Sequence, residues 1–162
     1  MAPFFTFMKY LIGIGNYSMY DDSVGLRLIE HIHTHHLENY SKFRAIEIGG
    51  NLLNLLTYFN EETDAILFVD AGRIEGLSPG EYLLFTPNEV DTTKELKNIS
   101  THEGDLMKVI ELARTTGYKI PEIRVMGIAP LEVKNGIGFS PLLTAHLHHY
   151  ARTAIDAIVQ FG

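Results

Sequence analysis

The sequence predicts an α/β fold of three layers, in which a mostly parallel or mixed five-stranded sheet has helices on both faces. Two observations predict it. Short apolar runs that end in glycine or aspartate alternate with segments whose apolar residues recur at helical spacing, as in a parallel sheet with crossover helices. The length of 162 residues and the 46% of hydrophobic residues are those of one globular unit. We therefore expect residues 1–162 to form a single domain.

Five apolar runs are the expected strands. Most of them lack polar alternation, which is typical of strands buried on both faces. They are residues 10–15, 45–50, 65–70, 82–85 and 123–128. The turn-rich stretch 72–80 allows the fourth strand to run antiparallel to its neighbours.

Four segments carry apolar residues at helical spacing. The first begins near Val24, a shorter one covers residues 52–59, and the third contains residues 106–113 and ends before Gly117, a residue suited to stop a helix. The last helix has the clearest start, because Ser140 and Pro141 fit the N-cap and first-turn positions. We expect this helix to pack on the sheet.

Composition excludes several functions. The formal net charge of −7 opposes binding to a phosphate polyanion, so we expect no nucleic-acid partner. The absence of cysteine rules out disulfides, thiolate metal ligands and a cysteine nucleophile, so any metal ligand must be histidine or a carboxylate. No apolar run reaches the length of a membrane span, and the N-terminal residues lack the basic start of a signal peptide. These features predict a cytoplasmic protein without membrane insertion.

Polar residues at the ends of the expected strands are the candidate functional residues, since open parallel sheets bind ligands at the carboxyl ends of their strands. Three places qualify: residues 15–22, 70–72 and 100–105. We expect two carboxylates and a histidine from these stretches to converge: Asp21 or Asp22, Asp70 and His102. Simpler interpretations exist: Asp21 or Asp22 caps the following helix, Asp70 is a turn residue, and His102 is a surface histidine.

Two other interpretations concern cofactors. The Gly13-Ile14-Gly15 sequence suggests a dinucleotide loop, but Ser18 replaces its third glycine and the following aspartates would repel a pyrophosphate. Seven further histidines fall in two helical clusters. Only residues three or four apart share a helix face, which yields the pairs His31/His35 and His146/His149. We interpret both clusters as helix surface.

One segment resembles a known family. Residues 13–25, GIGNYSMYDDSVG, resemble the opening motif of the nickel–iron hydrogenase maturation endopeptidases, G-x-G-N followed by D-[DE]-x-x-G. Four further landmarks follow in the family's order, and Ser23 departs from the usual glycine. The landmarks are residues 49–50 (GG), 69–71 (VDA), 100–102 (STH), and 127–130 with 138–141 (GIAP and GFSP).

The resemblance implies an α/β fold and an activity: removal of a C-terminal extension from the hydrogenase large-subunit precursor after nickel insertion. It also implies that Asp22, Asp70 and His102 contact the metal and act in catalysis. Carboxylate and imidazole ligands bind a borderline divalent ion while leaving positions open for substrate groups. We therefore expect nickel to arrive with the substrate as its recognition tag, and we expect no organic cofactor.

The peptide bond would then be attacked by water with carboxylate assistance, because the sequence has no G-x-S-x-G elbow and no cysteine. Asn16, Gly49 and Gly50 are candidate substrate-binding residues, through the side-chain amide or backbone groups. The glycines have a simpler interpretation as turn residues. Two other functions stay open: a nickel-dependent checkpoint protein without protease activity, and a nucleotide-binding α/β module.

Overall fold

The computed structural model describes residues 7–49, 51–87 and 101–161, with side chains in the last range from residue 105 onward. Strands and helices alternate along the chain as predicted. The strands are β1 (Met8–Ile14), β2 (Arg44–Ile48), β3 (Thr63–Ala71), β4 (Tyr82–Phe85) and β5 (Glu122–Ile128). The helices are η1 (Tyr20–Ser23), α1 (Val24–Thr34), η2 (Leu52–Tyr58), α3 (Thr101–Thr115) and α4 (Pro141–Gln160), of which η1 and η2 are 3-10 helices.

The five strands form one mixed sheet in the order β2-β1-β3-β5-β4. The first four of these are parallel, and β4 pairs antiparallel with β5, as the turn-rich stretch before it allowed. Ile12 pairs with Phe68 across β1 and β3, and Val69 pairs with Met126 across β3 and β5. The chain therefore leaves β1 toward β2 on one side and returns to β3 on the other, which places the topological switch point between β1 and β3.

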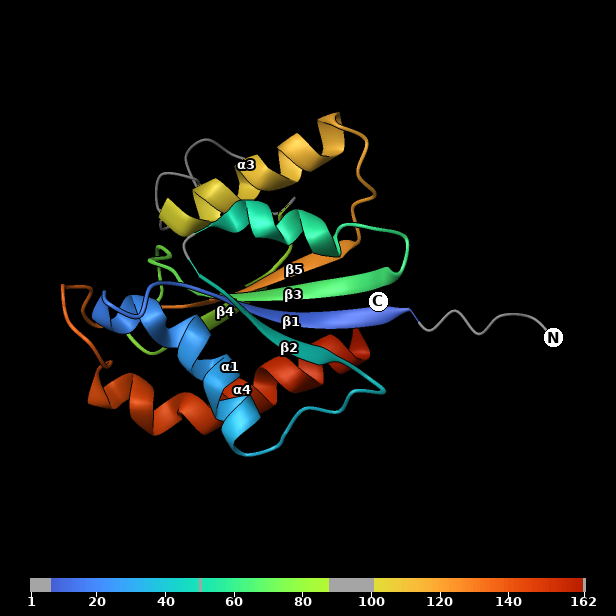
Figure 1. The fold of residues 1–162 in the computed structure, drawn as a ribbon. Coiled ribbons are helices and arrows are strands. Elements are labelled where there is room, and N and C mark those ends of the chain that lie inside the picture. Colours follow the sequence, from blue (N-terminus) through green and yellow to red (C-terminus); the bar gives the residue numbers. More distant parts are fainter. Residues whose placement is uncertain (1–6, 50, 88–100, 162) are drawn as a thin grey trace.

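Helices cover both faces of the sheet (Figure 1). On one face α1 and α4 pack against alternate strand residues that include Leu11, Leu67 and Met126. On the other face η2 and α3 pack against the intervening residues, which include Ile12 and Phe68. This period-two division of the strand side chains produces two apolar cores and confirms the predicted three-layer α/β architecture.

Local signals explain where the helices begin and end. Ser140 is the N-cap of α4 and Pro141 follows it at the start of the helix, as predicted. After α3 the chain turns at Gly117, whose φ of +86° is a left-handed conformation that favours glycine. The segment 52–58 differs from a regular short helix because it is a 3-10 helix, which begins with the Asn51 side chain accepting a hydrogen bond from the Leu53 N–H.

Candidate functional site

The carboxyl ends of β1 and β3 meet the start of α1 at very short range. A Cβ atom on Gly25, in the first turn of α1, would lie 2.3 Å from the Val69 carbonyl oxygen and 2.6 Å from that of Ile14. Only glycine permits this approach, so the helix start rests directly on the two strand ends. The structure thereby brings the turn that carries Asp22 beside the end of β3, which carries Asp70.

A second glycine fixes the turn between β1 and α1. A Cβ atom on Gly15 would lie 2.3 Å from the carbonyl oxygen of Asp22, so the loop 15–22 folds back on itself. Tyr20 in this loop has a φ of +54°, which non-glycine residues rarely adopt. Such conformations persist where the surrounding structure holds them, and they concentrate at functional sites.

Both predicted carboxylates are buried at this switch point. Asp22 is 8% exposed and Asp70 is 1% exposed. A carboxylate is costly to bury, and carboxylates kept inside a protein are paired, hydrogen-bonded or used to bind a cation. The simpler interpretation of Asp70 as a turn residue is wrong, because Asp70 is the second-last residue of the strand β3 and lies in its buried run.

The third predicted ligand, His102, lies in the first turn of α3. Figure 1 shows this end of α3 on the side of the sheet where the parallel strands end. The His102 side chain, Ser100 and Gly50 lie outside the described residues. The three-ligand set thus stays a prediction, for which the described part of the chain supplies Asp22 and Asp70.

Asp21 performs a role that the sequence did not indicate. Its carboxylate is fully buried and accepts hydrogen bonds from three backbone N–H groups of the segment between β5 and α4: Leu131 at 3.0 Å, Glu132 at 2.9 Å and Ser140 at 2.6 Å. The interpretation that Asp21 or Asp22 caps α1 is wrong, since the N-cap of that helix is Ser23. The Asp21 carboxylate instead binds a segment more than 100 residues away. Asp21 joins the two segments that border the site.

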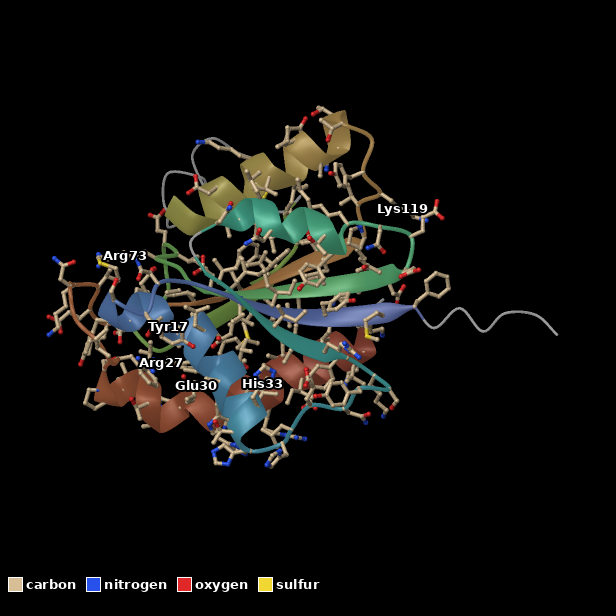
Figure 2. All side chains as sticks on the ribbon, in the orientation of Figure 1. Tyr17, Arg27, Glu30, His33, Arg73 and Lys119 are labelled. Atoms are coloured by element: carbon tan, nitrogen blue, oxygen red, sulfur yellow. The ribbon has the colours of Figure 1, made fainter. Side chains whose placement is uncertain are left out.

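An arginine on α1 contacts aromatic rings of both the loop 15–22 and the segment between β5 and α4. The Arg27 guanidinium lies 4.7 Å from the centre of the Tyr17 ring and 5.7 Å from that of Phe139. The Tyr17 hydroxyl donates a hydrogen bond to Glu47 in β2. Burial and the Glu47 carboxylate raise the pKa of Tyr17 well above its ordinary value, so the hydroxyl keeps its proton. Figure 2 shows Tyr17, Arg27 and Arg73 at the same end of the molecule, with Lys119 at the other.

The predicted substrate-binding residues have distinct surroundings. Asn16 is exposed, and its side-chain oxygen accepts hydrogen bonds from the backbone N–H and the hydroxyl of Ser18 at 2.9 and 2.7 Å. Gly49 is exposed directly after β2, and nothing lies within 4 Å of the position of a Cβ atom there. The open space beside Gly49 leaves its backbone accessible, and the substrate-binding role of both residues stays a prediction.

The histidine clusters are less separate than the sequence suggested. His31 on α1 contacts His35, the C-cap residue of that helix, with ring centres 4.3 Å apart. The Nε2 atom of His31 also lies 3.0 Å from Nδ1 of His148 on α4. The contact between α1 and α4 brings this third ring in, which helical spacing alone could not show. Even so, among the residues with described side chains, no three histidine or acidic residues form a group that would hold a metal ion.

Comparisons with known proteins identify the family of this chain. Residues 26–157 match the profile of the hydrogenase maturation protease family. The chain belongs to the hydrogenase maturation protease family. It is therefore an endopeptidase of hydrogenase maturation, as predicted, and the family assignment favours this over a nucleotide-binding module.

Relatives of this protease family cover nearly the whole chain. The hydrogenase expression/formation protein HupD of Rhodobacter capsulatus is 29% identical over 154 residues, 94% of this chain and 71% of the relative. HoxM of Azotobacter vinelandii, also described as a hydrogenase expression/formation protein, is 25% identical over 94% of this chain and 72% of the HoxM chain.

Among the helices of the described residues, none is long and apolar enough to cross a membrane.

Solved structures of maturation endopeptidases share the fold. The hydrogenase maturating endopeptidase HybD from E. coli superposes with a TM-score of 0.76 at 21% identity, over 94% of this chain and 93% of the other. The [NiFe] hydrogenase maturation protease HybD from Thermococcus kodakarensis also has a TM-score of 0.76, at 23% identity over 93% and 99% of the two chains. At these identities the likeness establishes the mixed five-stranded α/β fold.

Proposed function

We propose that this protease removes the C-terminal extension of a nickel–iron hydrogenase large-subunit precursor after nickel has been inserted. The observation that carries the proposal is the pair of buried carboxylates, Asp22 and Asp70, on two segments that meet at the switch point. His102 in the first turn of α3 would complete the set. Carboxylate and imidazole groups are suitable ligands for a borderline divalent ion such as nickel.

In this proposal the nickel ion belongs to the substrate. Three ligands without a thiolate make an open site of modest affinity, and the chain has no cysteine with which to close it. A precursor that carries nickel can supply the remaining ligands, whereas a metal-free precursor cannot. The same carboxylates would assist attack by water on the scissile carbonyl, with the proton passing to the departing amine. The chemistry requires no organic cofactor.

The family assignment disfavours the other function left open by the sequence, a checkpoint protein that uses the same three residues to detect nickel but cuts nothing. The two functions differ in the product, since only a protease shortens the precursor. Purified protein is treated with a chelator, freed of it, and incubated with nickel-loaded or metal-free large-subunit precursor. Mass spectrometry of the precursor then reports cleavage.

We expect the stripped protein to shorten the nickel-loaded precursor by its C-terminal extension and to leave the metal-free precursor intact. Activity that returns only when metal is restored to the protease, with equal cutting of metal-free precursor, would make this an ordinary metalloprotease. Binding of the nickel-loaded precursor without any cleavage would contradict the proposal. A cytoplasmic location remains part of the proposal.

A further inference from the structure

The segment that joins β5 to α4 presents three apolar side chains to solvent. Ile137 is 76% exposed, Leu131 is 51% exposed and Val133 is 37% exposed. We call these three residues the apolar ledge. Single exposed apolar residues are ordinary on protein surfaces, but three within seven positions of one loop are a feature that needs a physical reason.

The apolar ledge is held firmly rather than left as a loose loop. Besides the three hydrogen bonds to the Asp21 carboxylate, the Gly136 N–H donates to the Ser18 carbonyl at 2.8 Å, and the Tyr20 N–H donates to the Gly136 carbonyl at 3.0 Å. The Asp21 N–H also donates to the Glu132 carbonyl at 3.2 Å. Every one of these bonds reaches residues 18–21, which directly precede Asp22.

The segment 131–137, which carries the ledge, has no formal net charge although the whole chain is acidic. Its two charged residues pair with each other, since the Lys134 ammonium lies 3.3 Å from the Glu132 carboxylate. Lys134 also lies over the Tyr20 ring, 4.6 Å from its centre. A neutral, apolar surface favours an apolar partner. Because hydrogen bonds already hold the segment in place, little ordering entropy is lost when that partner binds.

We infer that the apolar ledge is a docking surface for the precursor polypeptide, on the apolar side chains that flank its cleavage site. The inference rests on the proposed function, since it takes the substrate to be a protein whose chain reaches Asp22 and Asp70. Hydrogen bonds join the segment of the ledge to the turn that carries Asp22, so a polypeptide bound at the two carboxylates lies near the ledge. Docking there contributes to the affinity for the precursor.

The test compares full-length variants with nickel-loaded large-subunit precursor as the probe. Leu131→Gln/Ile137→Gln removes the two most exposed apolar side chains. Leu112→Gln is the matched control, because Leu112 is 44% exposed near the other end of α3 and glutamine is a good helix former. Leu131→Ile/Ile137→Leu keeps the ledge apolar and serves as the conservative variant. Thermal unfolding checks that all three remain folded.

We expect the glutamine double variant to raise the KM for processing about ten-fold with kcat within two-fold, since about 1.4 kcal/mol of binding corresponds to ten-fold. The control and conservative variants should keep the KM of the unsubstituted protein. An unchanged KM in the double variant, or an equal rise in Leu112→Gln, would overturn the docking surface while leaving the proposed function intact. If the unsubstituted protein neither binds nor cuts the precursor, the proposed function itself fails.

Discussion

Two adjacent aspartates of one turn have different tasks. Asp22 is a proposed metal ligand with Asp70, whereas the Asp21 carboxylate accepts three backbone hydrogen bonds from the segment 131–140. Neither aspartate caps α1, whose N-cap is Ser23. Because the two side chains have different tasks, substitution of Asp22 should affect activity and substitution of Asp21 should affect stability.

Alanine at each proposed ligand should abolish processing without unfolding the protein. Asp22→Ala, Asp70→Ala and His102→Ala remove polar groups at strand and helix ends, which contribute little to the apolar cores. Processing of nickel-loaded precursor, followed by mass spectrometry, measures the loss, and circular dichroism measures the fold. His149→Ala, on the exposed face of α4, should process normally. Equal loss from this control would show that the wrong histidine has been chosen.

Asp21→Asn should chiefly destabilise the protein. An amide can accept on one side only, so at least one of the N–H groups of Leu131, Glu132 and Ser140 is left facing an NH₂ group. Loss of a charge-assisted hydrogen bond with an unsatisfied buried donor costs about 2 kcal/mol. Urea unfolding should report a free energy of unfolding lower by about that amount. A stability equal to that of the unsubstituted protein would mean that the carboxylate does not hold the segment.

At the scale of elements, the junction of α1 with β1 and β3 is a very close backbone contact beside the site. Gly25→Ala would place a methyl group 2.3 Å from a backbone oxygen that has no rotamer with which to move away. We expect α1 to shift, a free energy of unfolding lower by about 1–3 kcal/mol, and reduced processing, because the Asp22 turn shifts with the helix. Gly49→Ala is the stability control, since its Cβ would meet nothing within 4 Å. Equal unfolding midpoints for both variants in urea would contradict the packing argument.

The contact between α1 and α4 should depend on pH. Burial and the neighbouring rings of His35 and His148 lower the pKa of His31 from its ordinary 6.5. The unfolded chain then takes up the proton before the folded one as the pH falls. Stability should thus be full above about pH 6.5 and decrease as the pH falls through the lowered pKa of the folded state.

Urea unfolding at a series of pH values tests the histidine contact. His31→Gln should flatten the decrease in stability between pH 7 and pH 5, because the group with the lowered pKa is gone. His36→Asn, an exposed position with a φ of +51° that asparagine tolerates, should retain the decrease. A His31→Gln protein with an unchanged pH profile would assign the dependence to other groups.

For the whole molecule, the sequence predicted what depends on local pattern. Uniformly apolar runs such as residues 65–70 indicated buried strands, and the turn-rich stretch 72–80 allowed an antiparallel β4. Asp22 and Asp70 were found because strand ends of a parallel sheet meet at one edge. Local spacing was therefore enough for the layers, the five strands and the two carboxylates now described.

What the sequence could not predict depends on contacts between distant segments. Asp21 binds Leu131 across 110 positions, and His31 meets His148 across 117. No periodicity relates such residues, because their distance is set by how α4 packs against α1 and the sheet. The apolar ledge belongs to the same class, since an apolar residue in a loop indicates burial as readily as exposure until the loop is placed.

The strand order has a consequence for how the chain is made. β3 is the most thoroughly buried strand, and its two sheet neighbours are β1, synthesised before it, and β5, synthesised only after residues 72–121. While the chain emerges from the ribosome, one side of this apolar strand therefore lacks its neighbour, and an unpaired apolar edge is a template for aggregation. A nascent chain that stops before residue 122 thus exposes the unpaired edge of β3 and should aggregate readily. Once β5 has been synthesised, it pairs with that edge and covers it.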